Sequence, residues 1–339
     1  MAVTRSDVAQ AAGVSPAVVS YVLNNGPRPV SKDARARVTA AVEKLGYRPN
    51  AIASALRGGS THSIGFMSPN PRNPFYAELG EALERHLSAR GYLVLTGNTY
   101  YDRSREDRYL RTFIDRKVDG LIFSSGISLV ASPAPGIEQP VLALDFAGAN
   151  DQFSTVRTDD AADSASAVEH LQRHGHELIG CIGGPSLIGT EPERINGWRR
   201  QQDAAQLPSG DELVAFGEMS EDGGNAAASQ LLSDHGRPWA LHGHRPTALF
   251  VASDVQAIGV IYACYELGLR VPEDVAIVSL GGTKAVGYTI PPMTSMRQDI
   301  EFTASLATEN LLARIHDSSL APSAVTLRGN LVIGRSCGC

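Results

Sequence analysis

Residues 15 to 24 combine small side chains with hydrogen-bonding ones at helical spacing. In a helix, the valines and leucine of this stretch fall mainly on one face, and the other face carries Ser15, Ala17, Ser20, Tyr21 and Asn24. Small side chains allow contact with a thymine methyl group, and a tyrosine hydroxyl can donate a hydrogen bond to a base edge. Because no Arg, Gln or Asn stands at position 16 or 17, base readout would rest on shape, apolar contacts and Tyr21.

Two short helices joined by a glycine turn are predicted to position this face. Thr4 and Asp7 have capping-box spacing at the start of the first helix. Ser15 is a good N-cap for the second helix, and Pro16 suits its first position because no hydrogen bond is lost there. A third helix, capped by Ser31, covers the other two. The pattern is a helix-turn-helix, whose second helix enters the major groove.

Charge is divided unevenly along the 339 residues. The chain has 30 Lys and Arg against 36 Asp and Glu, a formal net charge of −6. Residues 1–60 hold eight of the basic and three of the acidic residues, so they carry +5 and the remainder carries −11. Local positive charge suits the phosphate backbone of DNA. The alternatives are chance clustering of basic residues on solvated helices and an ordinary three-helix packing module.

Four sequence runs in this head carry a family resemblance. They are VTRSDVA at 3–9, AGVS at 12–15, VSYVLN at 19–24 and LGYRPN at 45–50. In this order they resemble the lactose-repressor/galactose-repressor (LacI/GalR) family of bacterial transcription regulators. The resemblance implies DNA contacts from Thr4, Ser15, Pro16, Ala17, Ser20, Tyr21, Asn24, Tyr47, Asn50, Ala53 and Leu56. Many relatives carry Arg at the position of Tyr21 and Thr at that of Val18, so the operator sequence stays open.

The segment after the head resembles the hinge helix of this family. Asn50 can cap a helix of under two turns, which is too short to be stable alone and should order only on DNA or against a second copy. Leu56 matches the leucine that relatives push into a minor-groove step to kink the duplex. A plain linker with one exposed leucine, ending in the glycines and serine at 58–60, is the alternative.

From Ser63 onward, short apolar runs alternate with amphipathic segments, which is typical of parallel βαβ units. Strands are predicted at 64–67, 93–95, 120–123, 141–144, 178–182, 248–251 and 275–278, with a short one near 214–215. Two doubly wound sheets in tandem place a ligand crevice at the carboxyl ends of their strands. This half resembles the same family, and the periplasmic sugar-binding fold, at 73–76, 117–122, 194–198 and 297–299.

The expected fold class is α/β with an all-α head. The resemblance covers essentially the whole chain and implies a helix-turn-helix domain at 1–48, a hinge helix and linker at 49–60, and an effector-binding domain at 61–339. The last is a periplasmic-binding-protein-like body of two doubly wound parallel-sheet lobes. Because the chain of that fold crosses three times between lobes, we expect lobe 1 at about 61–158 and 293–325. Lobe 2 is then expected at about 159–292 and 326–339.

The same resemblance places a small-molecule effector in the crevice between the lobes. Phe75 and Tyr76 would stack on a ring, and Asp145 would accept hydrogen bonds from hydroxyls. Arg194 has the planar fork that suits a carboxylate, phosphate or diol. Further candidates are Met219, Ser253, Asp254 and Gln298. The alternatives are structural roles, such as core packing for Phe75, a surface ion pair for Arg194 and a helix cap for Asp254.

One departure from the family bears on the effector. After the strand at 275–278 relatives usually carry Phe-Asp-Asp or Tyr-Asp-Asp, whereas this chain reads Ser279-Leu280-Gly281-Gly282. Loss of that carboxylate removes a partner for sugar hydroxyls. Either the effector is not a typical free sugar or the pocket has degenerated, so the sequence names no effector.

Other reactive side chains indicate no catalytic or metal chemistry. His170 and His174 have a spacing that can hold a metal, but the end of a helix stopped by Gly175 suits cationic side chains without one. Cys337 and Cys339 have no second pair of cysteines, and we expect an ordinary tail there. The glycine pairs at 183–184 and 281–282 lack a phosphate-binding spacing. We therefore expect no metal, no cofactor and no enzyme.

The whole sequence predicts a homodimeric transcription regulator, a repressor, that binds palindromic operator DNA under the control of a small metabolite. No apolar run of about 18 residues and no signal-peptide pattern occurs, so we expect no membrane partner and a cytoplasmic location. Two alternatives remain, a cytoplasmic solute-binding or sensor protein with vestigial DNA binding, and a sugar-modifying enzyme. Whether the effector is an inducer or a corepressor stays open.

Overall fold

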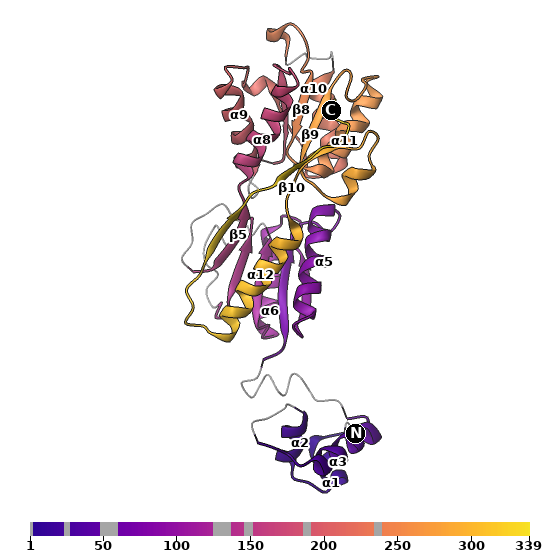
Figure 1. Ribbon diagram of the computed structural model, residues 1–339, viewed down its shortest axis with the longest axis vertical. Coiled ribbons are helices and arrows are strands. Elements are labelled where there is room, and N and C mark those ends of the chain that lie inside the picture. Colours follow the sequence, from indigo (N-terminus) through magenta and orange to yellow (C-terminus); the bar gives the residue numbers. More distant parts are fainter. Residues whose placement is uncertain are drawn as a thin grey trace. The chain divides into compact units, whose positions relative to one another are not determined.

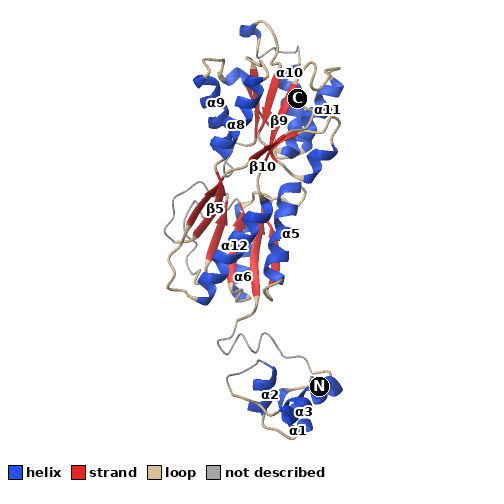
Figure 2. Ribbon diagram, in the orientation of Figure 1, coloured by secondary structure: helices blue, strands red, loops and turns tan. Residues whose placement is uncertain are grey.

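The computed structural model describes residues 3–23, 28–47, 60–124, 137–145, 152–185, 191–233 and 239–339. The chain divides into two compact units, Met1–Thr61 and His62–Cys339. The described part of the first unit is helical, and the second contains both helices and strands, so the predicted fold class is confirmed (Figures 1 and 2). Asn24, Asn50, Ala53 and Leu56, and with them the predicted hinge helix, lie outside the described residues.

The first unit packs α1 (Arg5–Ala12), α2 (Pro16–Leu23) and α3 (Lys32–Leu45) around a small apolar core. Each helix contributes one fully buried valine, namely Val8, Val19 and Val38. The predicted capping box is present, because the Thr4 hydroxyl accepts the Asp7 N–H and the Asp7 carboxylate accepts the Thr4 N–H at 2.7 Å. These hydrogen bonds from Thr4 lower the pKa of Asp7.

The second unit contains two six-stranded sheets. The first sheet has the order β11-β5-β4-β3-β1-β2, and all of its strand pairs are parallel. Its strands are β1 (Ser63–Ser68), β2 (Leu93–Asn98), β3 (Gly120–Ser124), β4 (Val141–Leu144), β5 (Ser154–Thr158) and β11 (Ala324–Leu327). Helices α5 (Pro74–Ser88) and α12 (Ile300–His316) bury their apolar faces in one core cluster, and α6 (Arg103–Asp115) packs in another. We call this sheet with its helices lobe 1.

The second sheet has the order β12-β10-β9-β8-β6-β7 and is parallel except for the antiparallel pair β10–β12. Its strands are β6 (Ile179–Gly183), β7 (Val214–Phe216), β8 (Ala248–Val251), β9 (Ala276–Gly281), β10 (Thr294–Arg297) and β12 (Asn330–Val332). Helices α8 (Asp160–Arg173) and α9 (Glu191–Ala204) pack into one core cluster, and α10 (Glu221–Leu232) and α11 (Asp254–Glu266) into another. Single 3₁₀ turns are η1 (Asp211–Leu213), η2 (Ala240–His242) and η3 (Lys284–Tyr288). We call this sheet with its helices lobe 2.

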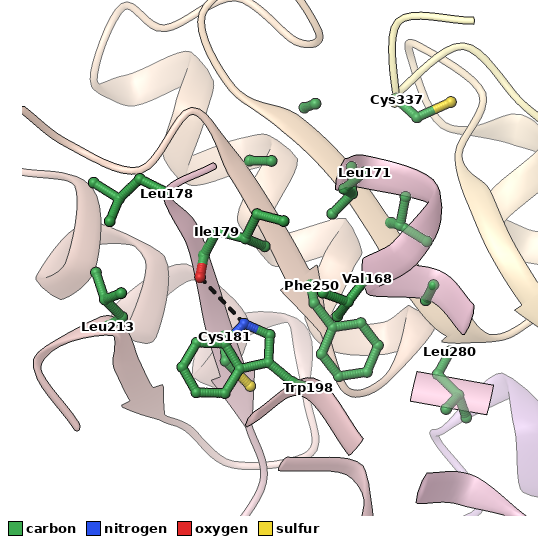
Figure 3. Packing of buried hydrophobic residues seen from close by; sticks show 14 of the residues in the cluster. Val168, Leu171, Leu178, Ile179, Cys181, Trp198, Leu213, Phe250, Leu280 and Cys337 are labelled. Carbon is green, nitrogen blue, oxygen red and sulfur yellow. Dashed lines mark hydrogen bonds between the residues drawn. The ribbon is translucent and has the colours of Figure 1, made fainter. Parts of the chain in front are cut away.

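The core between the second sheet, α8 and α9 is built around the fully buried Trp198. Its indole N–H donates to the carbonyl oxygen of Ile179 at 3.1 Å, so the ring packs among apolar side chains without an unpaired donor (Figure 3). None of the helices in the described part of the chain is both long and apolar enough to span a membrane.

Three passages connect the two sheets, from β5 to α8, from β10 to α12 and from β11 to β12. The second passage lies later in the chain than the sequence suggested. Residues 294–297 pair with β9 and β12 in the second sheet, so the chain returns to lobe 1 after Arg297 and not near residue 293. The short strand is buried between its two neighbours, an environment that only the tertiary pairing creates.

Candidate functional site

Two buried carboxylates in the first turn of α8 tie the passages between the lobes together. Asp163 accepts Nε–H of Arg328 at 2.8 Å and the N–H of Gly329 at 2.7 Å, both from the passage between β11 and β12. Asp160 accepts the side-chain amide of Gln298, from the passage between β10 and α12, at 3.2 Å. Both aspartates are fully buried, and burial raises the pKa of Asp163. These hydrogen bonds therefore link the start of α8 to the other two passages between the lobes.

One cavity is lined by residues of both lobes. It receives all eight effector-site candidates and five further residues, two of which belong to the run that departs from the family pattern. The candidates are Phe75, Tyr76, Asp145, Arg194, Met219, Ser253, Asp254 and Gln298, and the additions are Asn73, Tyr101, Leu280, Gly281 and Thr283. The free space among these side chains is about 30 Å³. Because that is far below the roughly 300 Å³ of a small ligand pocket, a ring-shaped ligand requires the lobes to open or side chains to move.

Asp145 follows directly after β4, and its carboxyl group has a strongly raised pKa. Its backbone has a positive φ of 51°, which aims the residue away from the strand. Burial, and next the negative charge of Asp160, raise its pKa to about 7 against the pull of Arg194. A carboxyl group with this pKa changes charge near neutral pH, so it can accept hydrogen bonds as an anion or donate one as an acid.

Arg194 belongs to α9 and bridges two other segments of lobe 2. Its Nε–H donates to Asp160 at 3.0 Å, and Nη1 donates to the carbonyl oxygen of Ala252 at 2.7 Å. The ion pair is buried, since the two side chains are only 12% and 1% exposed. The alternative of a surface ion pair is therefore wrong, and the guanidinium is held in place at the wall of the cavity.

Asp254 is fully engaged by the protein. Oδ1 accepts the hydroxyls of Ser279 at 2.6 Å and Ser295 at 2.8 Å, and Oδ2 accepts the N–H and hydroxyl of Thr283 at 2.7 and 2.9 Å. The N-cap of α11 is the preceding Ser253, so Asp254 is not the helix cap that the alternative suggested. Its carboxylate instead fixes the loop after β9 and the strand β10 beside the cavity.

The glycine pair in that loop has a steric reason. Gly281, with φ of 138°, lies where an added Cβ would be 2.9 Å from Oδ2 of Asp254. Gly282, with φ of 69°, lies where an added Cβ would overlap the backbone of Arg297. Side chains are therefore excluded from both positions as long as Asp254 and β10 keep their places. Close packing against Asp254 and Arg297 therefore accounts for glycine at 281 and 282, where relatives usually carry carboxylates.

The N-terminal end of α2 forms the exposed face of the first unit. Ser15, Pro16 and Ala17 are exposed, while Ser20 and Tyr21 are half-buried. A shallow groove runs between α2 and the start of α3, with Tyr21 on one side and Arg28 on the other. Arg28 was not among the predicted DNA contacts, although its positive charge close to α2 in the sequence could have indicated a phosphate contact.

The other described head candidates are used by the fold itself. The Thr4 hydroxyl donates to Asp7 at 2.8 Å within the capping box. Tyr47 packs against the core of the three helices. Ser15 also has a structural part, because its hydroxyl accepts the N–H of Val18 at 3.4 Å at the start of α2. Ala17 and Tyr21, two further candidates on the α2 face, line the groove beside that helix.

Comparison with known proteins accounts for both units. Residues 4–50 match the family described as bacterial regulatory proteins, lacI family, and residues 168–337 match a periplasmic binding protein-like domain. The ribose operon repressor of Escherichia coli (strain K12) is 33% identical, over 94% of this chain and 94% of that protein. The chain belongs to the LacI family. A second LacI-family relative, the HTH-type transcriptional repressor PurR of Proteus mirabilis (strain HI4320), is 32% identical over 98% of this chain and 96% of that protein.

Solved structures of two transcription regulators match nearly the whole length of this chain. The crystal structure of the Lac repressor dimer bound to operator and the anti-inducer ONPF matches with a TM-score of 0.86 and 26% identity, over 99% of each chain. A complex of the transcriptional regulator CelR with cellobiose matches with a TM-score of 0.72 and 27% identity, over 98% of this chain and 99% of that chain. The sequence-based assignment to this family is thereby confirmed.

Proposed function

We propose that this LacI-family protein is a cytoplasmic transcriptional repressor. As a homodimer it binds a palindromic operator through the α2 faces of its two heads, and a small effector in the cleft controls its affinity for that operator. The observation that carries the proposal is the combination, in one chain, of an exposed α2 face with a cavity lined from two lobes. Linkage requires that an effector which weakens operator binding is itself bound more weakly on the operator.

Control of the operator by the cleft requires two lobe arrangements that the effector distinguishes. The set of hydrogen bonds at the first turn of α8 is the place about which the lobes turn. The small free volume of the cavity supports an effector that selects a more open arrangement than the one described. The hinge segment with Leu56 would transmit this change by pairing, or failing to pair, in the minor groove.

The lining of the cavity supports a small polar metabolite with a ring. Phe75 and Tyr76 pack edge to face with their centroids 5.3 Å apart and offer an apolar wall. Arg194 and Asp145 add a fixed cation and a carboxyl group that titrates near neutral pH. We assign Asp254 to shaping this site, because each of its oxygens already has two protein donors.

The curated relatives described above are repressors and not enzymes. We propose that this chain likewise has no catalytic step. The tests below must be able to distinguish this proposal from two alternatives, a sensor with vestigial DNA binding and a sugar-modifying enzyme. A thermal-shift screen with sugars, sugar phosphates, nucleobases and small acids tests the cleft, because a bound ligand stabilises the folded state by mass action.

Operator binding is tested by Tyr21→Ala. The full-length protein is titrated with its own promoter fragment and with a scrambled fragment of equal length, at fixed salt. Loss of a base contact should weaken promoter binding by about tenfold or more and scrambled binding much less. Tyr265→Ala is the matched control, because Tyr265 is 79% exposed on α11 and should change neither affinity.

Three results would count against this proposal. Equal losses on both fragments in Tyr21→Ala would contradict base reading by Tyr21. No binding of any promoter fragment by the wild-type protein at low salt would favour the sensor alternative. Turnover of a ligand found in the screen would favour the enzyme.

A further inference from the structure

Three metal-ligating side chains meet at the end of α8 that lies opposite its two buried aspartates. His170 is in the last turn of α8, His174 caps that helix, and Cys339 comes from the far end of the sequence. Sγ of Cys339 is 3.1 Å from Nε2 of His174 and 3.5 Å from Nε2 of His170. The three donor atoms all lie within 4.8 Å of one another. Their sequence separation hid this cluster from the motif analysis, which treated each part alone.

The segment that carries Cys339 is anchored, so the meeting is built into the fold. Ser336 is fully buried, and its hydroxyl donates to the carbonyl oxygen of Ile277 at 2.6 Å. Cys337 is buried in the same apolar cluster as Val168 and Leu171 of α8 (Figure 3). Its sulfur accepts the hydroxyl of Thr294 at 3.0 Å. The expectation of an ordinary tail is therefore wrong for residues 336–339.

The sulfur of Cys339 is the common point of this cluster. A ring nitrogen of His170 and one of His174 both face it, and the Cys337 thiol also lies 3.1 Å from it. A tetrahedral zinc ion with Zn–N of about 2.0 Å and Zn–S of about 2.3 Å holds nitrogen and sulfur roughly 3.5 Å apart. The two observed separations are close to that value. Imidazole and thiolate are also the ligands that zinc prefers.

We propose that His170, His174 and Cys339 bind a zinc ion, with water in the fourth position. The ion would fasten the segment 336–339 to α8 and thereby stabilise lobe 2. On binding, the Cys339 thiol loses its proton to solvent and its sulfur bonds to the metal. Cys337 takes no metal bond, because its sulfur accepts the Thr294 hydroxyl inside the core. Its thiol donates to the Cys339 sulfur at 3.1 Å and so positions Cys339.

Protonation of the ligands agrees with this assignment. Burial, with the neighbouring charges of His174 and Arg173, lowers the pKa of His170, which favours the neutral form of its ring. Burial and the contact with Cys337 raise the pKa of Cys339 to about 11 in the metal-free protein. Because zinc binds the thiolate and the neutral imidazole, zinc affinity should rise with pH.

Cobalt provides a direct probe of the ligand set. The reduced, metal-free full-length protein is titrated with Co²⁺, and we expect the visible bands of a tetrahedral ion together with a sulfur-to-cobalt charge-transfer band. Cys339→Ser should abolish the charge-transfer band, and His170→Gln and His174→Gln should each weaken binding by about tenfold or more. His176→Gln is the matched control. Nδ1 of His176 faces the Thr247 hydroxyl at 2.9 Å, so this variant should bind cobalt as the wild type does.

A second measurement needs no variant. Saturating zinc should slow the alkylation of Cys339 in the wild-type protein, while Cys181, Cys264 and Cys337 are buried and serve as internal references. Zinc should also raise the melting temperature of the wild type and of His176→Gln but not of Cys339→Ser. The proposal is overturned by a cobalt spectrum without the sulfur band, by unchanged affinity in the three ligand variants, or by alkylation of Cys339 that zinc does not slow.

Discussion

The α2 face and the cleft are assembled in opposite ways. The groove beside α2 is lined by residues from a single stretch between Val14 and Ala34. The cleft brings together residues from Asn73 to Gln298, and its polar groups are held by partners far away in the sequence. A substitution on the α2 face should therefore act on one contact or one helix end. A substitution in the cleft should act on several segments at once, and the following variants test this difference.

The largest effect is expected from Asp254→Ala. This change removes the acceptor of four hydrogen bonds and leaves donors of Ser279, Thr283 and Ser295 buried without a partner. The free energy of unfolding of the second unit should fall by about 4 kcal/mol. Because Trp198 and Trp239 are the two tryptophans of the chain and both lie in this unit, tryptophan fluorescence in a denaturant titration measures it. Asp222→Ala, at an exposed position of α10, should change little.

Gly281→Asp comes next and tests why the family carboxylate is missing here. The new side chain would combine a positive φ with a close approach to the Asp254 carboxylate. We expect a loss of about 3 kcal/mol in the same fluorescence measurement. Gly287→Asp is the control, because nothing lies within 4 Å of an added Cβ there and φ is not positive. A Gly281→Asp protein as stable as the control would mean that the glycines have no structural cause.

Asp145→Asn should stabilise the protein in a pH-dependent way. The folded-state pKa of about 7 lies above the ordinary value of 3.8, so ionisation of Asp145 opposes folding. The wild type therefore loses stability as pH rises from about 4 to about 7, while the asparagine variant does not. We expect the variant to gain on the order of 2 kcal/mol at pH 8, after allowance for partial exposure, and almost nothing near pH 4.

Denaturant titrations across this pH range measure the difference in the free energy of unfolding between Asp145→Asn and the wild type. Asp115→Asn, at the exposed end of α6, serves as the control for charge removal. If the stability advantage of the variant over the wild type became smaller as the pH rose, the raised pKa of Asp145 would be contradicted.

The difference between local and long-range contacts also explains how much of the fold and of the site could be predicted from the sequence. Helix caps such as Thr4 with Asp7 depend on a few adjacent residues, and they were found in the structure as predicted. The cleft candidates were brought together because the resemblance supplied their spatial order. The strand β10 and the buried pair Asp160 and Asp163 were not foreseen. The two aspartates are tied to partners more than 100 residues away, Arg328 and Gln298, which no local pattern encodes.

Thr4→Ala should have the smallest effect, and it tests whether the first unit is stabilised by local contacts. It removes the capping box of α1, which should destabilise the first unit by about 1 kcal/mol and leave the second unit unchanged. Hydrogen exchange of the α1 amides measures the first effect, and tryptophan fluorescence checks the second. Thr4→Ser keeps the hydroxyl and should behave as the wild type. Faster exchange confined to α1 would show that the head is stabilised by local contacts, whereas a matching shift in tryptophan fluorescence would show that the two units unfold together.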